Sequence, residues 1–186
     1  MTRLWLAVLR LLQRGLPRSA LARLGAGFGA LLWHVAGARR RVALRNLQLC
    51  FPAWSEARRL ELARAHFRAF GRAMLLETIP WWGRAAELAE LVEVEGLAHF
   101  EACRGQRVIL LVPHFVGINA GGVRIVQLGL DPVNIYSPVR NAAIEAVVLH
   151  SRQRFGACLL YDRQAGVKPV IRALRQGHPL HYSPDQ

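Results

Sequence analysis

The second half of the chain alternates short apolar runs with segments of helical periodicity, and this alternation restricts the fold most strongly. The runs typical of strands are Val92–Val94, Val108–Val112, Val133–Tyr136, Cys158–Tyr161 and Leu180–Tyr182. Helices are expected at Ser55–Ile79, Gly117–Leu128, Ala142–Phe155 and Val167–Gln176. Strands that alternate with helices form mostly parallel sheets joined by right-handed crossovers. The sequence therefore predicts an α/β fold, with a mostly parallel sheet flanked by helices.

The first fifty residues differ in character, because they contain nine arginines and no acidic residue. Two apolar stretches lie between the arginines, LWLAVL (4–9) and ALARLGAGFGALLWHVAG (20–37). The second has about the length of a short membrane span, but Arg23 and His34 interrupt it and glycines loosen it. We expect residues 1–37 to form one or two membrane-anchoring helices that lie on or dip into a bilayer. A buried helical hairpin within a larger core is the alternative.

Charge and cysteine content narrow the classes of partner. The formal net charge is +13, so the surface attracts anions such as phosphates, acidic proteins and anionic lipids. Arginines spread over amphipathic helices without a stacking-aromatic motif argue against nucleic-acid binding. The three cysteines are far apart and form no C-x-x-C pair, which argues against a disulfide framework and a zinc site. We expect no metal and no cofactor.

Polar and ionisable residues follow each expected strand. They are His114, the segment Ser137–Arg140, the pair Asp162–Arg163 and the segment Ser183–Asp185. In parallel α/β sheets the ligand lies beyond the carboxyl ends of the strands. We therefore expect these side chains to converge on one rim and to form a binding or catalytic site there.

Four motifs carry a resemblance to a known family: RNLQLCFPAWSE (45–56), HFVGIN (114–119), IYSPVRNAAIE (135–145) and YSPDQ (182–186). Their order and spacing resemble the late acyltransferases of lipid A biosynthesis. The resemblance implies transfer of a fatty acyl chain from acyl carrier protein to a hydroxyl of a lipid A precursor. It places the reaction at the cytoplasmic face of the bacterial inner membrane, with residues 1–37 as the anchor and 38–186 as the acyltransferase domain.

The family's catalytic motif is a histidine, four residues, and then Asp or Glu, which implies that His114 is the general base. A neutral imidazole takes the proton of the attacking hydroxyl, and a carboxylate on its other nitrogen stabilises the imidazolium. Asn119 stands at the carboxylate position. Three interpretations are open: an engineered inactive variant, a naturally weakened homologue, or a site served by another carboxylate, Asp162 or Asp185.

The resemblance also suggests that Arg140 and Arg163 bind phosphate on the glycolipid or on phosphopantetheine. Ser183 and Asp185 are expected to contact substrate from the same rim. The chain ends at SPDQ, where family members continue, so we expect it to be C-terminally incomplete. The alternative function is a catalytically inactive homologue that binds lipid or a partner.

Overall fold

The computed structural model describes residues 1–185, which form two compact units. One unit comprises Leu9–Thr78, and the other comprises Met1–Val8 together with the chain from Ile79 onward. Helix α1 (Thr2–Gly15) begins in the second of these units and ends in the first. Each unit has its own packing and is described by itself.

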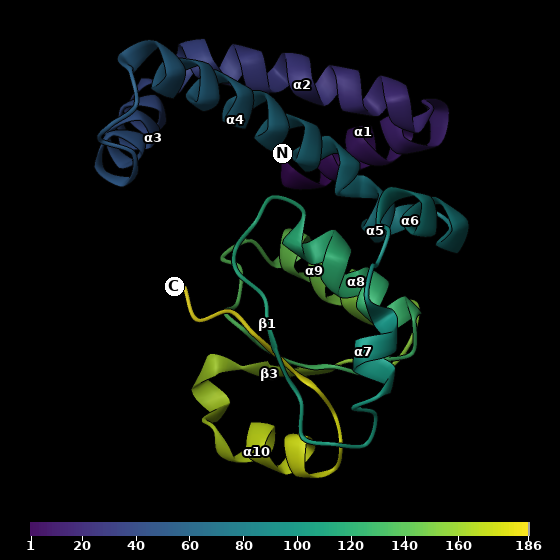
Figure 1. Ribbon diagram of the computed structural model, residues 1–186. Coiled ribbons are helices and arrows are strands. Elements are labelled where there is room, and N and C mark those ends of the chain that lie inside the picture. The colour runs from purple at the N-terminus through teal and green to yellow at the C-terminus, as the bar shows by residue number, and fades with distance from the viewer. Residues whose placement is uncertain (186) are drawn as a thin grey trace. The chain divides into compact units, whose positions relative to one another are not determined.

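The helical unit is built from α2 (Arg18–Val35), α3 (Gly37–Cys50) and α4 (Glu56–Leu76). Helices α2 and α4 run side by side, with α3 near one end of the pair (Figure 1). Trp33, Ala63 and Phe67 form the core, and the Trp33 and Phe67 rings meet edge-on with centroids 5.3 Å apart. The predicted start of α4 is confirmed, because the Ser55 hydroxyl accepts a hydrogen bond from the Arg58 backbone N–H.

Glycines bring the backbones of α2 and α4 into direct contact. A Cβ atom on Gly25 would lie 2.6 Å from the carbonyl oxygen of Gly71, and one on Gly29 would overlap the carbonyl of Phe67. Small residues spaced four apart commonly allow helices to approach this closely. Two of the glycines of 20–37, which we interpreted as loosening a membrane segment, therefore pack against the backbone of α4: Gly25 and Gly29.

Among residues 1–185, no helix combines the length and the apolar character needed to cross a bilayer. The anchoring role of residues 1–37 stays a prediction.

The second unit contains a four-stranded sheet whose order is β1-β4-β2-β3 and whose neighbours are all parallel. Its strands are β1 (Ile109–Leu111), β2 (Val133–Tyr136), β3 (Leu159–Asp162) and β4 (Leu180–Tyr182). Its helices are α5 (Thr78–Trp82), which begins at the boundary between the units, α6 (Ala85–Leu91), α7 (Leu97–Glu101), α8 (Ile118–Gln127), α9 (Ala142–Gln153), the 3-10 turn η1 (Arg163–Ala165) and α10 (Lys168–Arg175). The predicted α/β fold with a parallel sheet flanked by helices is confirmed.

Helices cover the two faces of the sheet. On one face, Val170 and Ala173 of α10 pack against Val133, Leu180 and their neighbours. Helices α8 and α9 lie on the other face (Figure 1). Because side chains alternate along a strand, Asn134 and His181, which follow Val133 and Leu180, point to the α8–α9 face. This alternation supplies polar groups to the cavity described below.

Two strand predictions were wrong in detail. Val92–Val94 is irregular and follows α6 without joining the sheet. A continuous apolar run such as 108–112 is typical of a strand buried on both faces, but β1 lies at the edge of the sheet, where Ile109 is 53% and Leu111 69% exposed. An apolar run predicts a strand but not the position of that strand in the sheet. The position of β1 depends on its pairing with β4, which lies 71 residues later in the sequence.

The glycine face predicts opposite results for two neighbouring substitutions in α2. Gly29→Ala should lower the free energy of unfolding by about 1–3 kcal/mol, because its methyl group overlaps the backbone of α4. Gly27→Ala is the matched control, since no atom lies within 4 Å of its Cβ position, and it should stabilise the helix by up to about 1 kcal/mol. Urea unfolding measures both. Equal effects of the two substitutions would contradict this packing.

Candidate functional site

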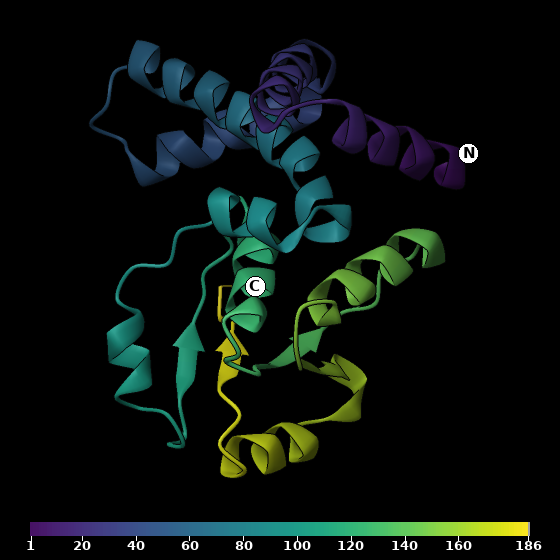
Figure 2. The same cartoon turned by 90° about the vertical axis from the view of Figure 1, so that its right-hand side faces the viewer.

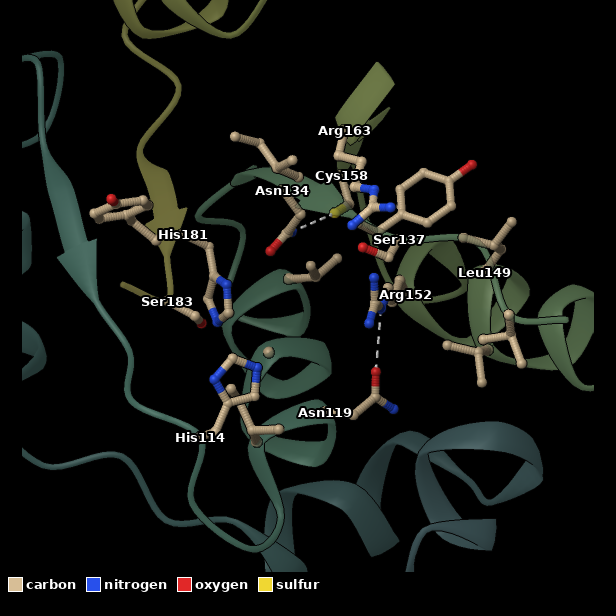
Figure 3. A pocket seen from close by; sticks show the side chains of 18 of the residues that line it. His114, Asn119, Asn134, Ser137, Leu149, Arg152, Cys158, Arg163, His181 and Ser183 are labelled. Carbon is tan, nitrogen blue, oxygen red and sulfur yellow. Dashed lines mark hydrogen bonds between the residues drawn. The ribbon is translucent and has the colours of Figure 1, made fainter. Parts of the chain in front are cut away.

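Residues just past each strand end surround a single cavity of about 520 Å³ in the α/β unit (Figure 3). His114 follows β1, Ser183 follows β4, Ser137 follows β2 and Arg163 follows β3. These four residues, all expected at one rim, are thus brought together, as the geometry of parallel strands requires.

The floor of the cavity is polar and its walls are largely apolar. Asn134, Cys158 and His181 come from the sheet and its margins, and the Asn134 amide lies 3.1 Å from the Cys158 sulfur. The walls come from α8 and α9, including Ile118, Gly122, Val126, Val148, Leu149 and Arg152. A concave apolar site with a few polar groups is typical of small-molecule and lipid-chain binding.

His114 is held by Asp185 through two hydrogen bonds. The ring Nδ1 lies 2.7 Å from Asp185 Oδ1, and the His114 backbone N–H donates to Oδ2 over 2.7 Å. These contacts, the backbone one foremost, lower the pKa of Asp185, so the carboxylate is ionised at neutral pH. With Nδ1 engaged by the carboxylate, Nε2 is the nitrogen left to take a proton from a ligand.

Strand pairing explains how residues so distant in sequence meet. Strands β1 and β4 lie side by side (Figure 2). In their register Leu111 lies opposite Tyr182, and Val112 N–H donates to the Tyr182 carbonyl. The Ser183 hydroxyl donates to the Val112 carbonyl over 2.7 Å, which extends the pairing past the strand ends. His114 and Asp185 each lie three residues beyond the paired Leu111 and Tyr182, and therefore at the same level of the rim.

Asn119 lies in the first turn of α8, and its Oδ1 accepts a hydrogen bond from Nε of Arg152 on α9 over 3.2 Å (Figure 3). The carboxylate on the ring of His114 is Asp185, which was one of the two substitutes considered. The other, Asp162, accepts a hydrogen bond from the Gln164 backbone N–H and so caps η1. The geometry favours the interpretation in which another carboxylate serves the histidine.

A family model for bacterial lipid A biosynthesis acyltransferases matches residues 1–186. The chain belongs to this family. It is 31% identical to a lipid A biosynthesis acyltransferase of Haemophilus influenzae, 30% to the lipid A biosynthesis lauroyltransferase of Escherichia coli, and 33% to the myristoyltransferase of the same organism. The alignments cover 98%, 98% and 89% of the chain, and 58%, 57% and 50% of the relatives. The chain thus spans about half the length of these relatives.

The remaining expected site residues fall into two groups. Arg163 and Ser183 line the cavity. Arg140 is exposed in the segment before α9 and is outside the set of described residues that line the cavity. Asn141 next to it caps α9, because its side-chain oxygen accepts from the backbone N–H groups of Ala143 and Ile144. The phosphate-binding roles of Arg140 and Arg163 stay predictions.

Sequence reasoning did not identify Arg152 and His181 as cavity residues. Arg152 sits late in an amphipathic helix, where a solvated arginine is the ordinary expectation. His181 forms an H-x-x-H pattern with His178, but the Nδ1 atom of His178 lies 3.1 Å from the carbonyl oxygen of Asp131. Within residues 1–185, no three metal-ligating side chains cluster.

His181 presents a buried Nε2 for which residues 1–185 provide no hydrogen-bond partner. Burial lowers the pKa of His181, and the positive charge of Arg152 lowers it further. The imidazole is therefore neutral at neutral pH. Its ring lies on the same side of the cavity as the ring of His114 (Figure 3).

The lowered pKa of His181 predicts a loss of stability in acid. The unfolded chain takes up this proton near pH 6.5 and the folded chain only at lower pH, so the contribution to stability is complete above pH 6.5 and declines below it. NMR titration of the ring should give a pKa below 6.5. Urea unfolding at pH 7.5 and 5.5 should show a smaller acid-induced loss for His181→Phe than for the unsubstituted protein. A ring pKa at or above 6.5 would refute this assignment.

Proposed function

We propose that this chain carries the catalytic centre of an acyltransferase that moves a fatty acyl group from the thioester of acyl carrier protein to a hydroxyl of a lipid A precursor. The observation that carries the proposal is the His114–Asp185 pair at the rim of a cavity with largely apolar walls. Membership in the lipid A acyltransferase family supports the reaction and the class of acceptor.

His114 acts as the general base. A lipid hydroxyl has too high a pKa to be ionised at neutral pH, so Nε2 of the imidazole takes its proton as the oxygen attacks the thioester carbonyl. The tetrahedral intermediate then collapses, the carbon–sulfur bond breaks, and the imidazolium returns the proton to the departing sulfur. Asp185 fixes the proton on Nδ1 and stabilises the positive charge while it lasts.

Asp185 replaces the carboxylate that the family motif places at position 119. Asp185, which lies 71 residues after His114 in the sequence, places a negative charge on the Nδ1 atom of the His114 ring. The rate loss expected from a neutral Asn119 is therefore offset, and the chain is proposed to be catalytically competent rather than a binding-only homologue.

Helix α1 supports action at the inner membrane surface. The side chains of Leu4, Trp5, Val8 and Leu11 are exposed and recur on one face of the helix, while Arg3, Arg10 and Arg14 occupy another. A helix of this kind lies in the plane of the interface and binds anionic lipid through its arginines. The net charge of +13 also favours an acidic carrier protein as the acyl donor.

Removing the carboxylate from His114 should reduce catalysis strongly. In the protein of natural length, Asp185→Asn should lower kcat for acyl transfer by roughly 10³- to 10⁴-fold, because the imidazolium loses its counter-charge and the ring can adopt the wrong tautomer. Asp162→Asn is the matched control and should change kcat by less than about threefold. Transfer is followed with acyl carrier protein as donor. An undiminished kcat for Asp185→Asn would contradict the assignment of Asp185 as the catalytic partner of His114. Lipid binding without turnover in the unsubstituted protein would favour a homologue that only binds.

The apolar face of α1 should drive membrane binding. Trp5→Glu and Leu11→Glu should each lower partitioning onto vesicles containing anionic lipid by about tenfold or more, since each removes about 1.5–3 kcal/mol of apolar burial and adds a negative charge. Ser19→Glu in α2 carries the same change of charge at an exposed position and serves as the control. Vesicle co-sedimentation measures binding. Equal partitioning of all three variants would contradict the proposal that α1 binds the membrane interface.

A further inference from the structure

Arg152 extends from α9 into the wall of the cavity, and Asn119 holds it there. The hydrogen bond from Arg152 Nε to Asn119 Oδ1 is 3.2 Å long, and both residues line the cavity. In Figure 3 the side chain of Arg152 lies across the cavity from the His114 and His181 rings, on the same side as Arg163. Two arginines thus lie along one side of the cavity and two imidazoles along the other.

A neutral amide at position 119 affects the charge of Arg152 differently from a carboxylate. An amide oxygen accepts a hydrogen bond from a guanidinium and fixes its plane, but it leaves the positive charge intact. A carboxylate in the same place would form an ion pair with Arg152 and cancel much of its attraction for an anion. His114 does not need a carboxylate from position 119, because Asp185 supplies one.

We propose that Arg152 binds a phosphate group of a substrate and that Asn119 positions Arg152 for this contact without neutralising it. The proposal rests on the proposed function, in which both substrates carry phosphate: the phosphodiester of phosphopantetheine on the donor, and the phosphates of the acceptor glycolipid. A planar guanidinium matches the oxygens of a phosphate, and charge-assisted hydrogen bonds are stronger than neutral ones.

Other charges around the cavity are compatible with an anion at this place. Arg163 lies on the same side and adds a second positive charge. Glu145 is the one acidic side chain among the described residues that line the cavity. It is seven residues before Arg152 on α9, which separates the two positions by about 10 Å along the helix. Among the described residues that line the cavity, arginines therefore outnumber acidic side chains by two to one.

Binding measurements with paired probes test the proposal without requiring turnover. Calorimetry on the protein of natural length compares 4′-phosphopantetheine with pantetheine, and a phosphorylated diglucosamine lipid with its dephosphorylated form. Arg152→Gln should weaken one phosphorylated probe by roughly 10- to 100-fold and its partner without phosphate by less than about threefold. The pair that responds identifies whether the phosphate belongs to the donor or to the acceptor. If neither pair distinguishes the variant from the unsubstituted protein, the proposal fails.

Variants at position 119 test the positioning role. Asn119→Asp should weaken the same phosphorylated probe at least as much as Arg152→Gln. Asn119→Ala should weaken it several-fold, but should add little once Arg152→Gln is present, because the two residues act as a unit. Arg172→Gln on α10, exposed on the other side of the sheet, makes the same change in net charge and should alter binding by less than about twofold.

Other outcomes separate the competing explanations. If Asn119→Asp speeds acyl transfer and keeps the affinity for phosphate, position 119 serves His114 and the proposal is overturned. If Arg152→Gln weakens both members of each pair equally, Arg152 has a structural role and the proposal is again overturned. If the unsubstituted protein transfers no acyl group but Arg152 still discriminates phosphate, the proposed function fails while the phosphate site stands.

Discussion

The parallel pairing of β1 with β4 is the constraint on which the site depends. Its register places the residues beyond the two strand ends at equal heights, so His114 and Asp185 meet although 71 residues separate them. The Asp185 carboxylate forms hydrogen bonds with both the backbone N–H and the ring Nδ1 of His114. These bonds fix the backbone at His114 as well as the orientation of its imidazole. A shift of one residue in this register would turn the side chains of β4 to the opposite face, and His181 would leave the cavity.

The sequence predicted the elements of the α/β unit better than their pairing. The apolar runs of β2, β3 and β4 and the periodicity of α8 and α9 are local signals, and the structure has all of them close to the expected positions. The strand order is a long-range property that no spacing encodes. For this reason the exposed edge position of β1 and the partner of His114 could not be chosen from the sequence alone. Asp185 could be named as a candidate because both residues follow strands, but only the β1–β4 neighbourhood distinguishes it from Asp162.

The N-terminal glycines illustrate a pattern with two physical meanings. Apolar helices with small residues four apart are typical of membrane segments, and equally of two helices whose backbones touch. In α2 the structure shows such a contact between backbones, because Gly25 and Gly29 lie against the backbone of α4 near Gly71. The matching signal in the sequence of α4 is Gly71, which lies on the same buried face of that helix as Ala63 and Phe67. The exposed apolar face of α1 is separate from these glycine contacts, and the proposed contact with lipid rests on it.

In the proposed function Asp185 and Asn119 have different roles, because the positive charges of His114 and Arg152 have different lifetimes. In the proposed mechanism the positive charge on His114 forms when the ring takes the proton of the hydroxyl, so its counter-ion must be present without being committed elsewhere. The charge on Arg152 is permanent, and a carboxylate placed between the two would pair with the guanidinium at all times. At an effective dielectric constant of 20, unit charges 4 Å apart interact by about 4 kcal/mol, which is enough to draw the carboxylate toward the arginine. With Asp185 committed to the histidine and a neutral amide on the arginine, each positive group keeps the environment that its chemistry requires.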